Sequence, residues 1–144
     1  MPTSFQVVID CGDPARVARF WAAALGYVLQ PPPAGHETWE AFLEATGVPR
    51  EDWNRASAVI DPEGKRPRLY FQRVPEGKVV KNRVHMDLNV GGGPDTVLEA
   101  KRELVDAEVE RLRGLGASIV RPVEEWGEYW VVMQDHEGNE FCVQ

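Results

Sequence analysis

The sequence predicts an α+β fold built from two copies of one βαβββ unit. Each half begins with a β-rich run that leads through a turn into a helix, at residues 5–25 and again at 84–115. Each half then continues through extended segments to a polar turn and a closing strand. We therefore place a first module at about residues 5–74 and a second at about 84–144, within a single domain spanning 1–144.

The first module opens with the β-rich run at residues 5–11 and continues as a helix over 15–25. Asp13 suits the N-cap of this helix, and Pro14 suits its first turn because proline lacks the N–H that would be unsatisfied there. Gly26 suits the left-handed residue that commonly ends a helix.

The second module repeats this order. Residues 84–90 form the expected strand, and Thr96 with Glu99 matches a capping box in front of a longer helix that ends near Gly116. The polar turn at 61–64 in the first module corresponds to the turn at 135–138 in the second. Each turn leads to a closing strand, with Phe71-Gln72 answered by Phe141-Cys142.

Residues 34–56 form an insertion that has no counterpart in the second module. Trp39, Phe42 and Leu43 stand at helical spacing, and a second short helix is expected after Pro49. We expect this segment to form a small satellite core, with a lid over a ligand as the alternative.

Composition excludes several classes of partner. Lysine and arginine total 16 against 23 aspartate and glutamate, a formal net charge of −7, whereas nucleic acids and anionic membranes require a basic face. No apolar run approaches the ~20 residues of a membrane span, and the N-terminus does not resemble a signal peptide. We therefore expect a cytoplasmic protein. Its two cysteines, Cys11 and Cys142, fit a reducing compartment, and we expect no disulfide between them.

Alternation along the first strand of each module separates an apolar face from a polar one. The apolar faces hold Phe5, Val7, Ile9 and Cys11 in one module and Val84, Met86, Leu88 and Val90 in the other. The polar residues fall at matching points 79 residues apart, so that Gln6 pairs with His85 and Asp10 with Asn89. We expect these polar faces to line a shared concavity, although polar sheet faces are often simply solvated.

The stretch LYFQRVPEGKVVKNRVHMDLNV and the ending DHEGNEFCVQ resemble the glyoxalase-like domains of the vicinal oxygen chelate superfamily. This superfamily includes glyoxalase I, bleomycin-resistance proteins and ring-cleaving dioxygenases. The resemblance spans nearly the whole chain and implies two modules that form an open curved barrel around a cavity. It also implies a homodimer and, in metal-dependent members, one metal ligand on each of four strands.

By this resemblance, the four positions that correspond to metal ligands are Gln6, Gln72, His85 and Cys142. The carboxylates expected on the closing strands are missing, and neither an amide nor a thiol readily replaces a carboxylate base, so we expect no glyoxalase I activity. We favour a site without metal because amides and a thiol compensate a hard divalent ion poorly. The alternative is zinc, iron, nickel or manganese bound by Gln6, His85, Glu140 and Cys142.

Without a metal, His85 and Asp87 are the candidate catalytic acid/base pair, each placed to address a ligand rather than the other. The alternative is that both merely satisfy buried polar groups. The candidate ligand-binding residues are Gln6, Asp10, Tyr70, Gln72, Glu140 and Cys142. Lys78, Lys81 and Arg83 form a short basic stretch that is either a solvated linker or an attraction for an anionic ligand.

We therefore expect a small-molecule-binding protein with a degenerate metal site, which either catalyses without metal or only binds. One alternative is a metal-dependent lyase, isomerase or dioxygenase. Another is an antibiotic-sequestering resistance protein, which differs from the first only in its ligand.

Overall fold

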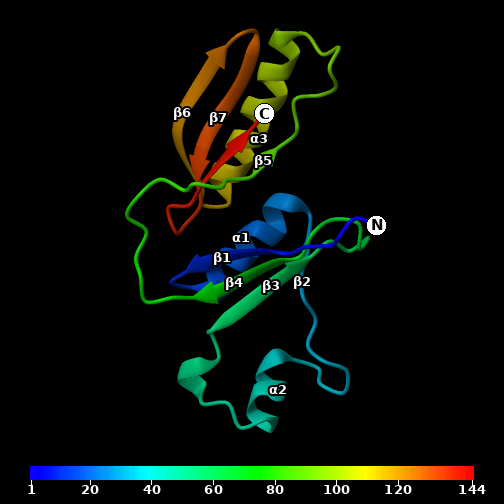
Figure 1. The fold of residues 1–144 in the computed structure, drawn as a ribbon, viewed down its shortest axis with the longest axis vertical. Coiled ribbons are helices and arrows are strands. Elements are labelled where there is room, and N and C mark those ends of the chain that lie inside the picture. The colour runs from blue at the N-terminus through cyan, green and yellow to red at the C-terminus, as the bar shows by residue number, and fades with distance from the viewer. The chain divides into compact units, whose positions relative to one another are not determined.

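The computed structural model describes residues 1–144. The chain folds into two compact units, residues 1–77 and 78–144 (Figure 1). Each unit holds one βαβββ module with a four-stranded sheet. The strand order is β1-β4-β3-β2 in the first unit and β5-β8-β7-β6 in the second, so the two sheets have the same topology. The α+β class and the predicted repeat are confirmed.

The first unit places one helix against its sheet. Its elements are β1 (Val7–Cys11), α1 (Pro14–Leu25), β2 (Val28–Leu29), α2 (Trp39–Ala45), a 3₁₀ turn (Arg50–Asp52), β3 (Ala56–Ile60) and β4 (Leu69–Arg73). β1 runs parallel to β4, and the other neighbouring strands are antiparallel. Trp21 of α1 and Phe71 of β4 are almost completely buried, so the core lies between α1 and the sheet.

The predicted ends of α1 are confirmed. The Asp13 carboxylate accepts a hydrogen bond from the Arg16 N–H at 3.2 Å, and Asn54 donates a second one to it at 2.8 Å. These two bonds hold the pKa of Asp13 below its usual value, with the Asn54 bond contributing most. Gly26 ends the helix in the left-handed region at φ 69°.

The insertion forms the expected helix at Trp39–Ala45, but none of the residues in this helix is buried. His36, Trp39 and Phe42 form edge-to-face ring contacts with centroids 5.2 and 5.8 Å apart. The Trp39 side chain also donates to the Gln30 carbonyl at 2.7 Å. The small satellite core that we expected therefore takes the form of a half-exposed aromatic cluster.

The second unit has its core between one long helix and the sheet (Figure 1). Its elements are β5 (Asp87–Leu88), α3 (Leu98–Gly114), β6 (Ser118–Glu125), β7 (Glu128–Gln134) and β8 (Glu140–Val143). The side chains that fill this core are Val105, Val109, Leu112, Val131, Met133, Phe141 and Val143. No helix of the chain is both long enough and apolar enough to cross a membrane.

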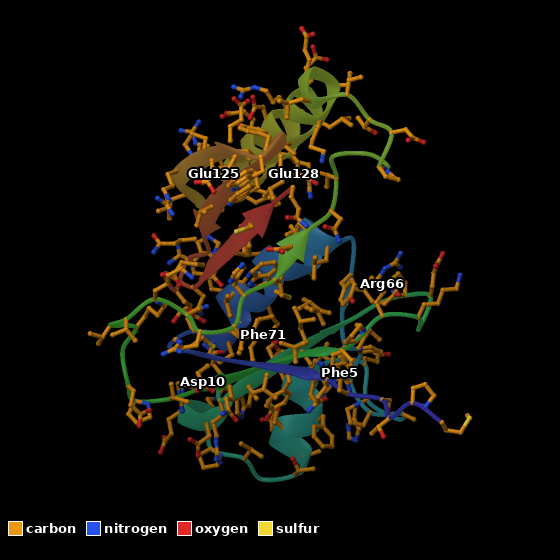
Figure 2. All side chains as sticks on the ribbon, turned by 45° about the horizontal axis from the view of Figure 1, so that its top comes forward. Phe5, Asp10, Arg66, Phe71, Glu125 and Glu128 are labelled. Carbon is orange, nitrogen blue, oxygen red and sulfur yellow. The ribbon has the colours of Figure 1, made fainter.

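Three local predictions were wrong. The strand is shorter than residues 84–90: β5 spans Asp87–Leu88, and its backbone hydrogen bonds to residues 142–144 run from Met86 to Val90. Val84 is 85% exposed because the chain bends at Arg83–Val84 before it reaches the sheet. Phe5 is 70% exposed and lies before Val7, the first residue of β1 that pairs with β4 (Figure 2). The capping box is absent: α3 begins after Val97, whose side chain makes no capping hydrogen bond.

The strand register corrects one part of the predicted repeat. Asp10 pairs with Gln72, whose side chain donates to it at 2.7 Å, and Gln144 donates in the same way to Asn89 at 2.9 Å. Gln72 therefore corresponds to Gln144, and Cys142 corresponds to Tyr70. The predicted match of Gln72 with Cys142 was displaced by two residues, because it aligned Phe71 with Phe141, whereas the register aligns Phe71 with Val143.

Candidate binding site on the second unit

The open face of the second sheet carries a pocket of about 400 Å³. Because Val131 and Phe141 point into the core under α3, alternation turns Trp130, Val132 and Cys142 to the opposite face. These three side chains form an apolar floor. The polar residues around it are Lys81, His85, Asp87, Arg121, Glu140 and Gln144.

His85, Asp87 and Cys142 come together on this face. Asp87 is in register with Cys142 across β5 and β8, and the three possible ligand atoms all lie within 4.8 Å of one another. His85 Nε2 is 3.3 Å from Asp87 Oδ1. The expectation that His85 and Asp87 would not contact each other was wrong, because His85 precedes the ladder and its side chain is free to turn toward Asp87.

The His85–Asp87 pair is accessible to a ligand. Their side chains are 37% and 43% exposed, so the alternative that both satisfy buried groups does not describe them. Cys142 beneath them is buried, and burial followed by the Asp87 charge raises the pKa of its thiol. A protonated thiol is a poor nucleophile, so the environment of Cys142 does not favour covalent attack by its sulfur.

Glu140 is held by the segment that leads into the second unit. Its carboxylate lies 3.1 Å from Lys78 Nζ and accepts the Asn82 N–H at 3.0 Å. Burial alone would raise the pKa of Glu140, but the hydrogen bonds from Asn82 and Lys78 outweigh it and lower this pKa from 4.5 to about 2. Both carboxylate oxygens are therefore engaged, which makes Glu140 a support for the pocket wall.

Two cations of the pocket lack an acidic partner. Lys81 donates only to the Asn82 carbonyl at 3.4 Å, and Arg121, beside Val132 on β6, has no carboxylate within ion-pair distance. Since Lys78 neutralises Glu140, these two cations are opposed only by Asp87. The pocket with Lys78 thus carries a net charge of about +1, in a protein whose net charge is −7.

The other candidate residues lie on the open face of the first unit. Gln6 accepts a hydrogen bond from Arg68 at 2.8 Å, while Gln72 donates to Asp10. Because Asp10 and Gln72 share one register row and Gln6 lies four residues earlier, the two glutamines do not meet. Tyr70 lies under the Arg68 guanidinium, 5.2 Å from ring centroid to Cζ.

The second unit offers part of a ligand set for a metal ion. The imidazole of His85, the carboxylate of Asp87 and the sulfur of Cys142 are the donor types that zinc prefers. A hard ion such as Mn²⁺ fits poorly, because it prefers oxygen donors. The predicted ligand set contained Glu140, whereas the group in the structure contains Asp87. Within the second unit these three residues are the ligands available to zinc, and the predicted amides of the first unit, Gln6 and Gln72, do not lie together as a pair.

Two βαβββ modules with a pocket on an open sheet face define a protein of the vicinal oxygen chelate superfamily. A family model described as a glyoxalase-like domain matches residues 6–144, and the chain therefore belongs to this family. No curated protein matches the chain by sequence.

Solved structures support the fold. A glyoxalase/bleomycin resistance protein/dioxygenase family enzyme from Burkholderia phytofirmans is 17% identical with a TM-score of 0.61, covering 96% of this chain and 94% of that one. A possible glyoxalase from Bacillus cereus is 14% identical with a TM-score of 0.62, covering 100% and 99%. A variant of the fosfomycin resistance protein FosX from Listeria monocytogenes, complexed with Mn(II) and 1S,2S-dihydroxypropylphosphonic acid, is 10% identical with a TM-score of 0.63, covering 100% and 90%.

Proposed function

We propose that the chain binds an anionic small molecule in the pocket of the second unit, without a metal ion. The observation that carries this proposal is the pair of cations without an ion-pair partner, Lys81 and Arg121, beside an apolar floor. Apolar contact supplies affinity for the body of a ligand, and a few placed charges fix its orientation. Homodimeric assembly and a cytoplasmic location belong to the same proposal.

His85 and Asp87 give this pocket the means to move a proton. When the imidazole is neutral and its Nε2 proton is held by Asp87, Nδ1 is left as an acceptor. His85 then acts as a general base toward a bound ligand, and Asp87 stabilises the imidazolium that forms. This arrangement suits a metal-independent isomerase or lyase, and it requires no glutamate base of the glyoxalase I kind.

Binding is tested with a panel of anions, read first by thermal shift, since a ligand of the native state stabilises it. The panel holds benzoate, phenylphosphonate and fosfomycin, with benzamide as a neutral counterpart of benzoate. Fosfomycin tests the antibiotic-sequestering alternative directly. We expect stabilisation by at least one anion and none by benzamide.

Calorimetry on Arg121→Ala then checks the role of charge. Loss of one partly exposed charge contact should weaken binding by about tenfold, a change of about 1.4 kcal/mol. Arg113→Ala is the matched control, because Arg113 pairs with Glu110 on the exposed surface of α3. Equal affinities for both variants, or stronger binding of benzamide than of benzoate, would contradict the proposal.

A zinc-dependent enzyme is the second candidate, favoured by the close approach of His85, Asp87 and Cys142. Bound there, zinc would supply a Lewis acid that polarises a ligand oxygen. The remaining groups would keep their roles, with Lys81 and Arg121 orienting an anionic ligand beside the apolar floor.

We expect less than stoichiometric metal in protein purified without chelator. Cys142 must lose a proton before it can bind a metal, and Asp87 already interacts with both neighbours. Elemental analysis measures zinc, iron, nickel and manganese in the native protein and in His85→Ala. A stoichiometric metal that disappears in the variant would overturn the metal-free proposal.

A further inference from the structure

The open face of the first unit holds a guanidinium group that no carboxylate neutralises. Arg68 is half-buried, its Nε donates to Gln30 Oε1 at 2.6 Å, and its Nη1 donates to Gln6 Oε1 at 2.8 Å. Its Cζ stands 5.2 Å from the centre of the Tyr70 ring. Two neutral amides and one aromatic ring therefore hold the charge in a defined position.

The sheet explains why these groups converge. Arg68 immediately precedes β4, beside Gln6, and its carbonyl accepts the Val7 N–H at 3.0 Å. Gln30 follows β2, and its N–H donates to the Ala58 carbonyl in the row that contains Tyr70. The long side chain of Arg68 thus spans β3, with Gln6 on one side and Gln30 on the other.

The convergence leaves hydrogen-bond donors without acceptors. A guanidinium has five N–H groups, and the hydrogen bonds to Gln30 and Gln6 engage two of them. Because both amides direct their oxygens at Arg68, their NH₂ groups face other directions and add further donors. The carboxylate of Asp10 on the same face is engaged by Gln72, and it lies four strand residues from Gln6, about 13 Å away.

We propose that Arg68, Gln6 and Gln30 form a binding site for the oxyanion of a small molecule, either a carboxylate or a phosphate. The planar fork of the guanidinium matches two oxygens of such a group, and its fixed position lowers the entropic cost of binding. Tyr70 completes the site as the ring that supports the guanidinium. All of these residues belong to the first unit, so the site does not depend on the function proposed for the second unit.

The test follows the Arg68 Nε–H resonance of ¹⁵N-labelled full-length protein during two titrations, one with sodium phosphate and one with sodium benzoate. Sodium chloride keeps the ionic strength constant. We expect a saturable shift of this resonance with at least one anion. Saturation by phosphate alone assigns a phosphate ligand, saturation by benzoate alone assigns a carboxylate, and both together assign a general oxyanion site.

Three variants complete the experiment, with binding followed by calorimetry. Arg68→Gln should lose binding, and Arg68→Lys should weaken it about fivefold or more, because lysine keeps the charge but not the fork. Arg19→Gln, exposed on α1, is the matched control and should bind like the native protein. A shift that never saturates, or unchanged binding by Arg68→Gln, overturns the proposal.

Discussion

Replacing Phe141 by alanine is expected to lower the free energy of unfolding by about 3–5 kcal/mol. Phe141 is 1% exposed on β8, within the core that α3 covers. Removing a buried ring costs its transfer free energy and leaves a cavity that the packed neighbours fill only in part. Urea denaturation followed by circular dichroism measures the loss.

Phe5→Ala is the matched control for this substitution. Phe5 is 70% exposed, so its truncation should change stability by no more than about 0.5 kcal/mol. Similar losses for the two variants would contradict the orientation of β8. The result also bears on the site, because strand alternation places Cys142 on the pocket face only if Phe141 points into the core.

Much of the fold was predictable because its signals are local. The ends of α1 follow from Asp13, Pro14 and Gly26, each of which suits one position of a helix terminus. The repeated order of strand, helix and turn indicated two modules. The register of the closing strands was not predictable, because it depends on how many residues the preceding turn holds and not on the strand sequence alone.

The candidate site was predictable in part. Strand alternation placed His85 and Asp87 on one face, but their direct contact depends on a bend at Arg83–Val84 that alternation cannot detect. The role of Arg121 was missed because the β6–β7 register shifts between Ile119 and Arg121, which breaks the alternation on which a prediction would rest.

Arg68 was overlooked for a different reason. It shares a face with Tyr70 and Gln72, which were selected, but its partners Gln6 and Gln30 come from distant parts of the sequence. Strand alternation places Arg68 on the same face as these two residues and could have identified it as a candidate. Only the structure shows that two amides hold its side chain in place. That the open faces of the two modules line one cavity stays a prediction.

Glu140→Gln is expected to destabilise the second unit at neutral pH and to lose its effect in acid. The pKa of Glu140 falls to about 2 in the folded protein from an ordinary value of 4.5. A lowered carboxyl pKa contributes stability above the unfolded value, and this contribution disappears as the pH falls through the folded value. The ion pair with Lys78 and the hydrogen bond from the Asn82 N–H supply this contribution to stability.

Because the Glu140 side chain is only 12% exposed, we expect a difference of about 1–3 kcal/mol between native protein and Glu140→Gln at pH 7. The difference should shrink between about pH 5 and pH 2. Urea denaturation across this range measures it, and taking the difference removes acid effects common to both proteins, such as those of Asp13 and Asp61. Glu63→Gln is the control, since Glu63 forms an exposed pair with Lys65. A difference that stays constant from pH 7 to pH 2 would show that the carboxylate charge does not stabilise the segment that borders the pocket.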